Sequence, residues 1–426
     1  MADEPVGGRV LEALGACAGG PELLDLAVGR DDVALVGGAV RDLLTGRTPR
    51  ELDVVVARDV ATFARQLASS LGALAGSNEH QRFRTAVVAW EGGRVDIAER
   101  RGETYPQDGA LPEVHQGTPM EDLERRDFTV NAIAVLLGGP QCGRLIHVDG
   151  ALEDLREGRL RVLHDRSFRD DPTRLLRLAR YQARLGFEPD GHTAELAAQA
   201  LADNALKTVS PARIGAELKL ALGEADPVAS LEALDRLGVL AALDAGLHLD
   251  VRLARRALEL LPEDGRPELL LMASLLLPTA LDLDEDVETA MWELLNDFEL
   301  PAADRDLVLR AAICGEAQAE ELHLAEEPSD VLEAVSCASL EGIALAGAWG
   351  EQERGAGDGA LHWARSWLEE LRHVRLEITG DDLIAAGLSE GPEIGWRLDA
   401  VLGRKLDGEL AGGREAELEA ALEAKV

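Results

Sequence analysis

The sequence predicts an α+β head over residues 1–150, followed by an all-helical body. Three observations support this prediction: strand and helix patterns alternate in the head, only helical patterns follow it, and aromatic residues make up just 3% of the chain. Because Leu and Ala must supply most of the 46% apolar composition, helices should dominate the packing. A chain of 426 residues is long enough for two or three domains, so we predict a helical neck over 151–222 and a helical body and tail over 223–426.

Short aliphatic runs and turn residues define the elements of the head. Two aliphatic runs predict buried strands that are each followed by a helix, and the next two flank the turn Gly92-Gly93 and predict a β-hairpin. A Gly- and Pro-rich segment then predicts a mobile loop. The predicted elements are, in order, strand 33–37, helix 40–44, strand 52–56, helix 60–71, strand 84–90, strand 94–97, loop 100–119 and helix 129–136.

A glycine pair, Gly37-Gly38, follows the first predicted strand and precedes a predicted helix. Glycines let a backbone approach a polyphosphate closely, and the start of a helix offers unpaired N–H groups to it. Arg41 adds a planar guanidinium suited to bidentate contact with phosphate oxygens. The segment lacks both the P-loop ending and the G-x-G-x-x-G pattern, which argues against an ATPase or a Rossmann site. For the glycine pair alone, a tight turn without a ligand is the alternative.

Two carboxylates, Glu51 and Asp53, lie at the start of the second predicted strand. Residues two apart on a strand point to the same face, and Asp96 on the hairpin could supply a third carboxylate. Such a group could hold two Mg²⁺ ions, one to activate an attacking 3′-hydroxyl and one to neutralise a pyrophosphate leaving group. A solvated strand edge is the alternative, and the glycine pair upstream favours the catalytic interpretation.

Several longer motifs occur in a fixed order over most of the chain. They are Val36–Asp42, Arg125–Ala132, Asp170–Arg177, Ala183–Phe187, Pro211 with Arg213, Glu217 and Leu218, Ile378–Ile384, and Gly391–Gly395. With these motifs the sequence closely resembles the class II tRNA nucleotidyltransferase and bacterial poly(A) polymerase family. The head of that family is of the DNA polymerase beta type and contains a mixed sheet.

The resemblance implies a template-independent nucleotidyltransferase that adds CCA, from CTP and ATP, to the 3′ end of tRNA with two Mg²⁺ ions. It implies that Glu51 and Asp53 bind the metal, with Asp96 as the third catalytic carboxylate expected above. The family usually has Asp at the position of Glu51 and an acid at that of His147, so the chain departs from the pattern twice. The nucleotide-binding residues that we expect are Gly37, Gly38, Arg41, Asp42, Arg125, Arg126, Asp127, Asn131, Asp170, Asp171, Arg174, Arg177 and Arg180.

The residues implied to select the base also suit that task chemically. Cytosine and adenine both present an amino donor beside a ring-nitrogen acceptor, which a carboxylate such as Asp171 and a guanidinium such as Arg174 can pair. Uracil and guanine present the opposite pattern and would leave buried charges unpaired. Asp171 before Pro172 also suits a helix N-cap, and both roles can hold at once. The arginines at 174, 177, 180 and 184 share one helical face, which either binds phosphate or is simply solvated.

Other functions are consistent with the same motifs. Enzymes that add only A, only C or poly(A) share all of them. A head that has lost activity and only binds RNA is a further alternative, because of Glu51 and His147. The intact Gly37-Gly38 pair, Arg41 and Asp53 argue against that alternative.

The net charge of −36 disfavours long-range attraction to RNA. Residues 1–220 carry 27 Lys and Arg against 34 Asp and Glu, whereas residues 221–426 carry 16 against 45. We therefore expect tRNA to bind through a few local Arg contacts, with a shallow dependence on salt. No secretory signal is visible, no apolar run is long enough to span a membrane, and the four dispersed cysteines predict buried thiols in a reducing cytoplasm. The sequence leaves the oligomeric state open.

Overall fold

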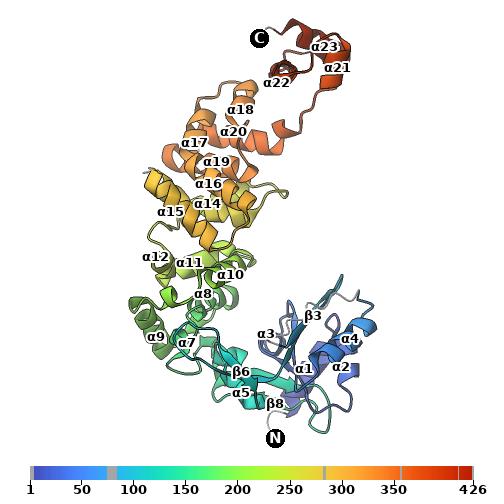
Figure 1. Ribbon diagram of the computed structural model, residues 1–426, viewed down its shortest axis with the longest axis vertical. Coiled ribbons are helices and arrows are strands. Elements are labelled where there is room, and N and C mark those ends of the chain that lie inside the picture. Colours follow the sequence, from blue (N-terminus) through green and yellow to red (C-terminus); the bar gives the residue numbers. More distant parts are fainter. Residues whose placement is uncertain (1–3, 74–83, 282–284, 356, 411, 425–426) are drawn as a thin grey trace. The chain divides into compact units, whose positions relative to one another are not determined.

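The computed structural model describes residues 4–73, 84–281, 285–355, 357–410 and 412–424 (Figure 1). The chain forms two compact units, Met1–Ser210 and Pro211–Val426. The first contains a mixed sheet with helices, and the second contains helices and no strand among its described residues, so the predicted fold class is confirmed. The division into head, neck and body at residues 150 and 222 stays a prediction.

A six-stranded mixed sheet forms the centre of the first unit, in the order β3-β4-β2-β1-β7-β8. Strands β2 and β4 pair in parallel, and the other neighbours pair antiparallel. Aliphatic side chains such as Leu35, Val54, Val95 and Ile133 are buried, which explains why these runs form central strands. The strands are β1 (Val33–Val36), β2 (Leu52–Val56), β3 (Thr85–Trp90), β4 (Gly93–Glu99), β7 (Ile133–Leu136) and β8 (Leu145–His147).

Helices in the N-terminal part of the chain pack with this sheet (Figure 1). Helix α4 packs against β3 and β4 through its buried residues Phe63 and Leu67, and α2 packs on α4. The strand-and-helix order predicted for residues 33–71 and the β3–β4 hairpin are confirmed to within a few residues. The helices are α1 (Glu4–Gly15), α2 (Gly20–Ala27), α3 (Gly38–Leu44) and α4 (Val60–Ser70).

Two predicted elements of the head are wrong. The helix expected over 129–136 is a short 3₁₀ turn, Thr129–Asn131, followed by β7. A short apolar run suits a buried strand as well as a helix, and here pairing with β1 and β8 on both sides decides for the strand. The loop expected over 100–119 contains an antiparallel hairpin, β5 (Arg101–Thr104) with β6 (Glu113–Gln116), and α5 (Pro119–Glu124) begins at its end.

The rest of the first unit is mainly helical. Helix α8 ends at Gly186, whose φ of 69° is left-handed backbone that favours glycine. Short strands β9 (Arg159–Leu160) and β10 (Glu188–Pro189) pair in parallel on either side of it in sequence. The helices are α6 (Ala151–Glu157), α7 (Ser167–Asp170), α8 (Arg174–Leu185), α9 (Gly191–Ala202) and the 3₁₀ turn η2 (Ala205–Thr208).

The second unit consists of helices packed through Leu and Ala, as the composition predicts. Its last part has a small core of its own around Leu383 and Val401. The helices are α10 (Pro211–Leu222), α11 (Pro227–Arg236), α12 (Val239–Leu243), α13 (Val251–Leu260), α14 (Pro267–Ala280), α15 (Glu285–Asp297), α16 (Ala302–Ile313), α17 (Gly315–Leu324), α18 (Pro328–Ala334), α19 (Leu340–Arg354), α20 (Gly359–Glu369), η3 (Leu371–His373), α21 (Gly380–Ala385), α22 (Pro392–Leu406) and α23 (Arg414–Glu423).

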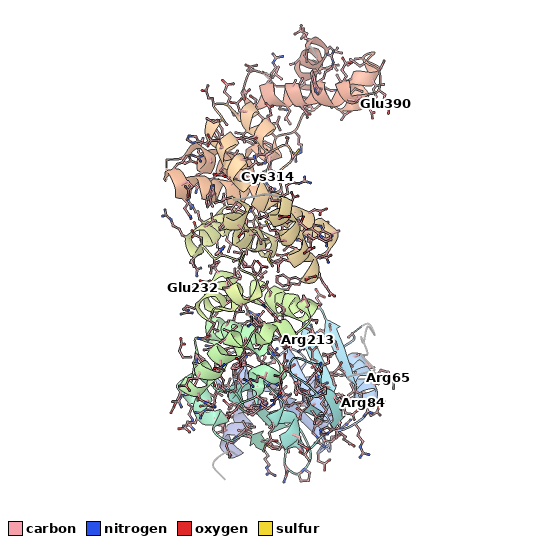
Figure 2. All side chains as sticks on the ribbon, turned by 60° about the vertical axis from the view of Figure 1, so that its left-hand side comes forward. Arg65, Arg84, Arg213, Glu232, Cys314 and Glu390 are labelled. Carbon is pink, nitrogen blue, oxygen red and sulfur yellow. The ribbon has the colours of Figure 1, made fainter. Side chains whose placement is uncertain are left out.

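The structure also tests two predictions made from the sequence, one on membrane-spanning segments and one on the burial of the cysteines. Among the described residues no helix has the length and apolarity that crossing a membrane requires. The prediction of buried thiols is wrong: Cys142, Cys314 and Cys337 are exposed and Cys17 is half-buried, with Cys314 visible in the second unit (Figure 2). Cys314 and Cys337 lie at helix ends or in connections, where a small apolar residue has no core to enter.

Candidate active site

Strand pairing brings the three predicted carboxylates together. In the parallel pair β2–β4, Asp53 lies opposite Asp96, and Glu51 directly precedes β2. One carboxylate oxygen from each of the three side chains lies within 4.8 Å of the others. Glu51 is exposed, whereas Asp53 and Asp96 are half-buried. Carboxylate oxygens at this spacing are the hard ligands that Mg²⁺ prefers, so the donor set fits the metal that the sequence implies.

The pKa of the Asp53 carboxyl group is raised by its surroundings. Burial raises the pKa of Asp53 to about 6, and the neighbouring carboxylates Glu51 and Asp96 act in the same direction. The guanidinium of Arg126 opposes this shift more strongly than that of Arg41. A cation bound at the three carboxylates would stabilise the ionised form that their mutual repulsion disfavours.

The glycine turn lies directly beside Asp53. Gly37 has φ 68° and ψ −136°, backbone that a residue with a Cβ rarely adopts. A Cβ at Gly37 would lie 2.6 Å from Nη1 of Arg126 and 3.6 Å from Oδ2 of Asp53. The absence of a Cβ at Gly37 thus allows Arg126 and Asp53 to lie close to the turn, and the approach of a polyphosphate to this glycine stays a prediction.

Asp122 holds the two arginines of the Arg125-Arg126 motif. Nη2 of Arg126 donates to Oδ2 of Asp122 at 3.1 Å, and Nε and Nη2 of Arg125 donate to its Oδ1 at 3.1 and 3.0 Å. Arg125 also donates to Glu103 on β5, at 3.2 Å. Burial would raise the pKa of Asp122, but Arg126 and Arg125 together hold it below its usual value. Nε of Arg126 is buried and has no hydrogen-bond partner within the described part of the chain.

A chain of buried hydrogen bonds connects the glycine turn to α8. Arg41, only 1% exposed, donates from Nε to Asp42 at 2.9 Å and from Nη1 to Oδ1 of Asn131. Asn131 donates to Oδ1 of Asp127 at 2.9 Å, and Nε and Nη2 of Arg177 donate to Oδ2 of Asp127 at 2.8 and 2.6 Å. Despite its burial, Asp127 has a lowered pKa because Arg177 and Asn131 stabilise its charge. The structure thus places Arg41 beneath the turn, with its guanidinium already hydrogen-bonded to protein acceptors.

Tyr181 is a residue of this network that the sequence analysis missed. Its ring lies under three guanidinium groups, those of Arg41, Arg177 and Arg180, with distances of 5.4, 5.6 and 5.2 Å to the ring centroid. It also meets Phe128 edge to face, with the ring centroids 5.9 Å apart. The sequence could have indicated this contact, because Tyr181 is four residues after Arg177 and such residues are neighbours on a helix.

The expected base-selecting residues lie at the start of α8. Arg174 is buried and donates from Nη1 to Oγ of Ser167 at 2.6 Å and from Nη2 to the carbonyl of Arg125 at 2.7 Å. Oδ1 of Asp171 accepts from the amide and hydroxyl of Thr173, at 3.1 and 2.6 Å, in a local side-chain turn. The N-cap of α8 is Thr173, so the prediction that Asp171 is the N-cap and Pro172 the first helical residue is wrong by two residues.

The neighbouring acids and arginines are also engaged. Asp170 accepts from Arg166 at 3.1 Å, and Arg184 donates to Asp42 at 3.3 Å. Arg180 is buried over Tyr181. The arginine face of α8 therefore packs into the first unit, and a merely solvated face is wrong for Arg174 and Arg180. His147 lies on β8 with its Nδ1 3.0 Å from the carbonyl of Val148.

The Gly37 turn lies beside three carboxylates on a mixed sheet, which is the arrangement expected of a nucleotidyltransferase head. The family model described as "Poly A polymerase head domain" matches residues 33–161. The A-adding tRNA nucleotidyltransferase of Geobacter sulfurreducens is 33% identical over 91% of this chain, which spans 45% of that relative's length. The CC-adding tRNA nucleotidyltransferase of Deinococcus radiodurans is 34% identical over 90% of this chain and 87% of its own length.

Solved structures agree with the sequence relatives. The Thermotoga maritima CCA-adding enzyme in complex with tRNA has a TM-score of 0.74 and 26% identity, covering 97% of this chain and 98% of that one. A CCA-adding enzyme in complex with CTP has a TM-score of 0.72 and 27% identity, covering 95% and 96%. The chain belongs to the class II tRNA nucleotidyltransferase and poly(A) polymerase head family, which includes CCA-, CC- and A-adding enzymes.

Proposed function

We propose that this chain adds CCA, from CTP and ATP, to the 3′ end of tRNA by two-metal nucleotidyl transfer. The observation that carries the proposal is the meeting of Glu51, Asp53 and Asp96 beside the Gly37 turn. The relatives with tRNA or CTP bound support tRNA and nucleoside triphosphates as substrates. The proposal extends to the whole reaction, although the chain spans about half the length of its A-adding relatives.

Glu51 and Asp53 would hold the metal ions, with Asp96 completing the acidic triad of these three residues. Mg²⁺ bound there would activate the 3′-hydroxyl of the RNA and stabilise the charge of the pyrophosphate leaving group. The absence of a Cβ at Gly37 leaves room for Nη1 of Arg126, so that a triphosphate bound at the turn would meet this guanidinium. Nε of Arg126 is buried and has no hydrogen-bond partner among the described residues. A guanidinium fixed by Asp122 can stabilise phosphate charge without first being ordered.

We further propose that Asp171 and Arg174 select cytosine and adenine. The burial of Arg174 and its bonds to Ser167 and to the Arg125 carbonyl fix the guanidinium, so that its remaining N–H groups have defined directions. Bases that present a ring N–H to a fixed donor leave both groups unpaired, and such a mismatch rejects the wrong nucleotide.

A narrower activity is the second candidate, because the relatives include both A-adding and CC-adding enzymes. The discriminating experiment uses tRNAs that end before C, after C and after CC, each with CTP or ATP alone. A CCA-adding enzyme should use CTP on the first two and ATP on the third. Incorporation restricted to A, or to C, would replace the first candidate by the narrower one.

A matched variant separates enzymatic from purely binding function. Asp53→Asn should abolish incorporation from both nucleotides while leaving the fold intact, because the substitution keeps the size of the side chain and removes a metal ligand. Wild-type protein that binds tRNA but incorporates nothing would instead favour the inactive, RNA-binding head.

A further inference from the structure

Arg94 contacts the acidic triad of Glu51, Asp53 and Asp96, but the proposed nucleotidyl transfer does not use it. It is two residues before Asp96 on β4, so both side chains point to the same face of the strand. Its Nε and Nη2 donate to Oδ1 and Oδ2 of Asp96 at 2.6 and 2.8 Å, and Nε lies 3.7 Å from Oε2 of Glu51. The guanidinium thus engages both oxygens of one member of the acidic triad and approaches a second.

A divalent cation and this guanidinium need the same oxygens. A metal held by Asp96 must take at least one oxygen that Arg94 now occupies, and two cations at one carboxylate repel each other. We propose that Arg94 is the internal counter-ion of the acidic triad and that a divalent cation displaces it from Asp96 on binding. The inference rests on the proposed function only in that a divalent cation binds the acidic triad.

The position of Arg94 suits displacement. Its side chain is 49% exposed, so the guanidinium can turn into water at small cost, unlike the buried Arg41. Without a metal, Arg94 offsets the repulsion among three carboxylates that lie within 4.8 Å. Once displaced, it stands beside the metal site as a free cation, where it can contact the phosphates of an arriving substrate. Metal and phosphate binding should therefore favour each other.

The test measures metal binding without turnover. Free Mn²⁺ is followed by electron paramagnetic resonance as Mn²⁺ is titrated into protein that lacks nucleotide and tRNA. Arg94→Gln should bind Mn²⁺ roughly three- to tenfold more tightly than wild type, because a competing ion pair of about 1 kcal/mol is lost. Arg94→Lys, which keeps the charge but cannot form the fork, should fall between the two.

A control arginine just before the neighbouring strand β3 excludes a general effect of charge. Arg84 is an exposed arginine of the first unit (Figure 2), and its Nη1 lies 2.7 Å from Glu99 at the far end of β4. Arg84→Gln should leave Mn²⁺ affinity unchanged. The Asp96→Asn background tests displacement itself: with the contested carboxylate gone, Arg94→Gln should no longer tighten binding.

The outcomes separate this inference from the proposed function. Unchanged or weaker Mn²⁺ binding by Arg94→Gln, or the same gain in the Asp96→Asn background, overturns displacement while leaving the metal site in place. Absence of Mn²⁺ binding by both wild type and Arg94→Gln overturns the metal site and the inference together. Binding by Arg94→Gln alone supports displacement in its strongest form. Thermal unfolding of each variant confirms that it is folded.

Discussion

Replacement of Gly37 by Ala should damage the site in two separable ways. The backbone at φ 68° and ψ −136° costs a residue with a Cβ about 1–3 kcal/mol. The new Cβ would also lie 2.6 Å from Nη1 of Arg126, closer than real Cβ contacts allow, so the guanidinium must leave the turn. We expect a melting temperature lower by roughly 3–10 °C and a loss of kcat/KM of at least about tenfold.

Two control glycines distinguish backbone strain from displacement of Arg126. Gly46 has φ 72° with open space around it, so Gly46→Ala should cost stability but not activity. Gly38 has no left-handed φ, and a Cβ there would meet Arg41 at 3.4 Å, so Gly38→Ala should have a smaller effect than Gly37→Ala. The assays are calorimetric unfolding and single-turnover incorporation. If Gly37→Ala behaves like Gly46→Ala in both assays, the contact with Arg126 has no part in activity.

Three further predictions follow from the buried charges and the surface charge. Tyr181→Leu should raise the KM for nucleotide and cost about 1–3 kcal/mol in urea unfolding, because three guanidinium groups lose their ring. Tyr181→Phe keeps the ring and should have a smaller effect, because it loses only the hydrogen bond that Nη2 of Arg177 donates to the hydroxyl at 3.2 Å. Asp127→Asn should cost about 3–5 kcal/mol at pH 7. Because the pKa of Asp127 is lowered in the folded state, the stabilisation by its carboxylate is present above about pH 4 and is lost as the pH falls further. The variant should therefore lose less stability than wild type as the pH falls from about 4 to about 2. The logarithm of tRNA affinity should fall only shallowly with the logarithm of salt concentration, and a slope corresponding to about ten phosphates would contradict binding by a few local arginines.

The sequence indicated which residues are candidates for the site, but not which residues they contact in the fold. The spacing of Glu51 and Asp53 predicts that both side chains lie on one face of the strand. Asp53 lies opposite Asp96 only because β2 pairs in parallel with β4, and no local sequence pattern specifies that pairing. The strand at Ile133–Leu136 was mistaken for a helix because a four-residue apolar run has no decisive period, and its neighbours in the sheet determine its conformation.

The carboxylates that pair with Arg126 and Arg177 were the second feature that the sequence analysis did not predict. An arginine motif predicts an anion site, but whether the anion is a substrate or a carboxylate of the same chain depends on side chains brought close by folding. Arg126 is held by Asp122, four residues earlier, which a helical pattern could have indicated. Arg177 is held by Asp127, fifty residues earlier in the chain, and only the tertiary fold of the first unit brings α8 and Asp127 together.

The pairing of arginines with buried carboxylates would allow a strongly acidic chain to have the proposed anion site. An arginine that is free in solution attracts phosphate but must be ordered when it binds, whereas one fixed by a buried carboxylate is ordered during folding. The acid lowers the net charge at the site, so long-range attraction is weak, but it does not cancel the field at a phosphate placed on the opposite side of the guanidinium. Arg126 has both properties: Asp122 and the Gly37 turn hold it in place, while its buried Nε has no acceptor among the residues that the structure describes. Acidic residues of the first unit, such as Asp122 and Asp127, thus hold arginines in place, so net charge alone is a poor guide to whether the proposed site can bind polyphosphate.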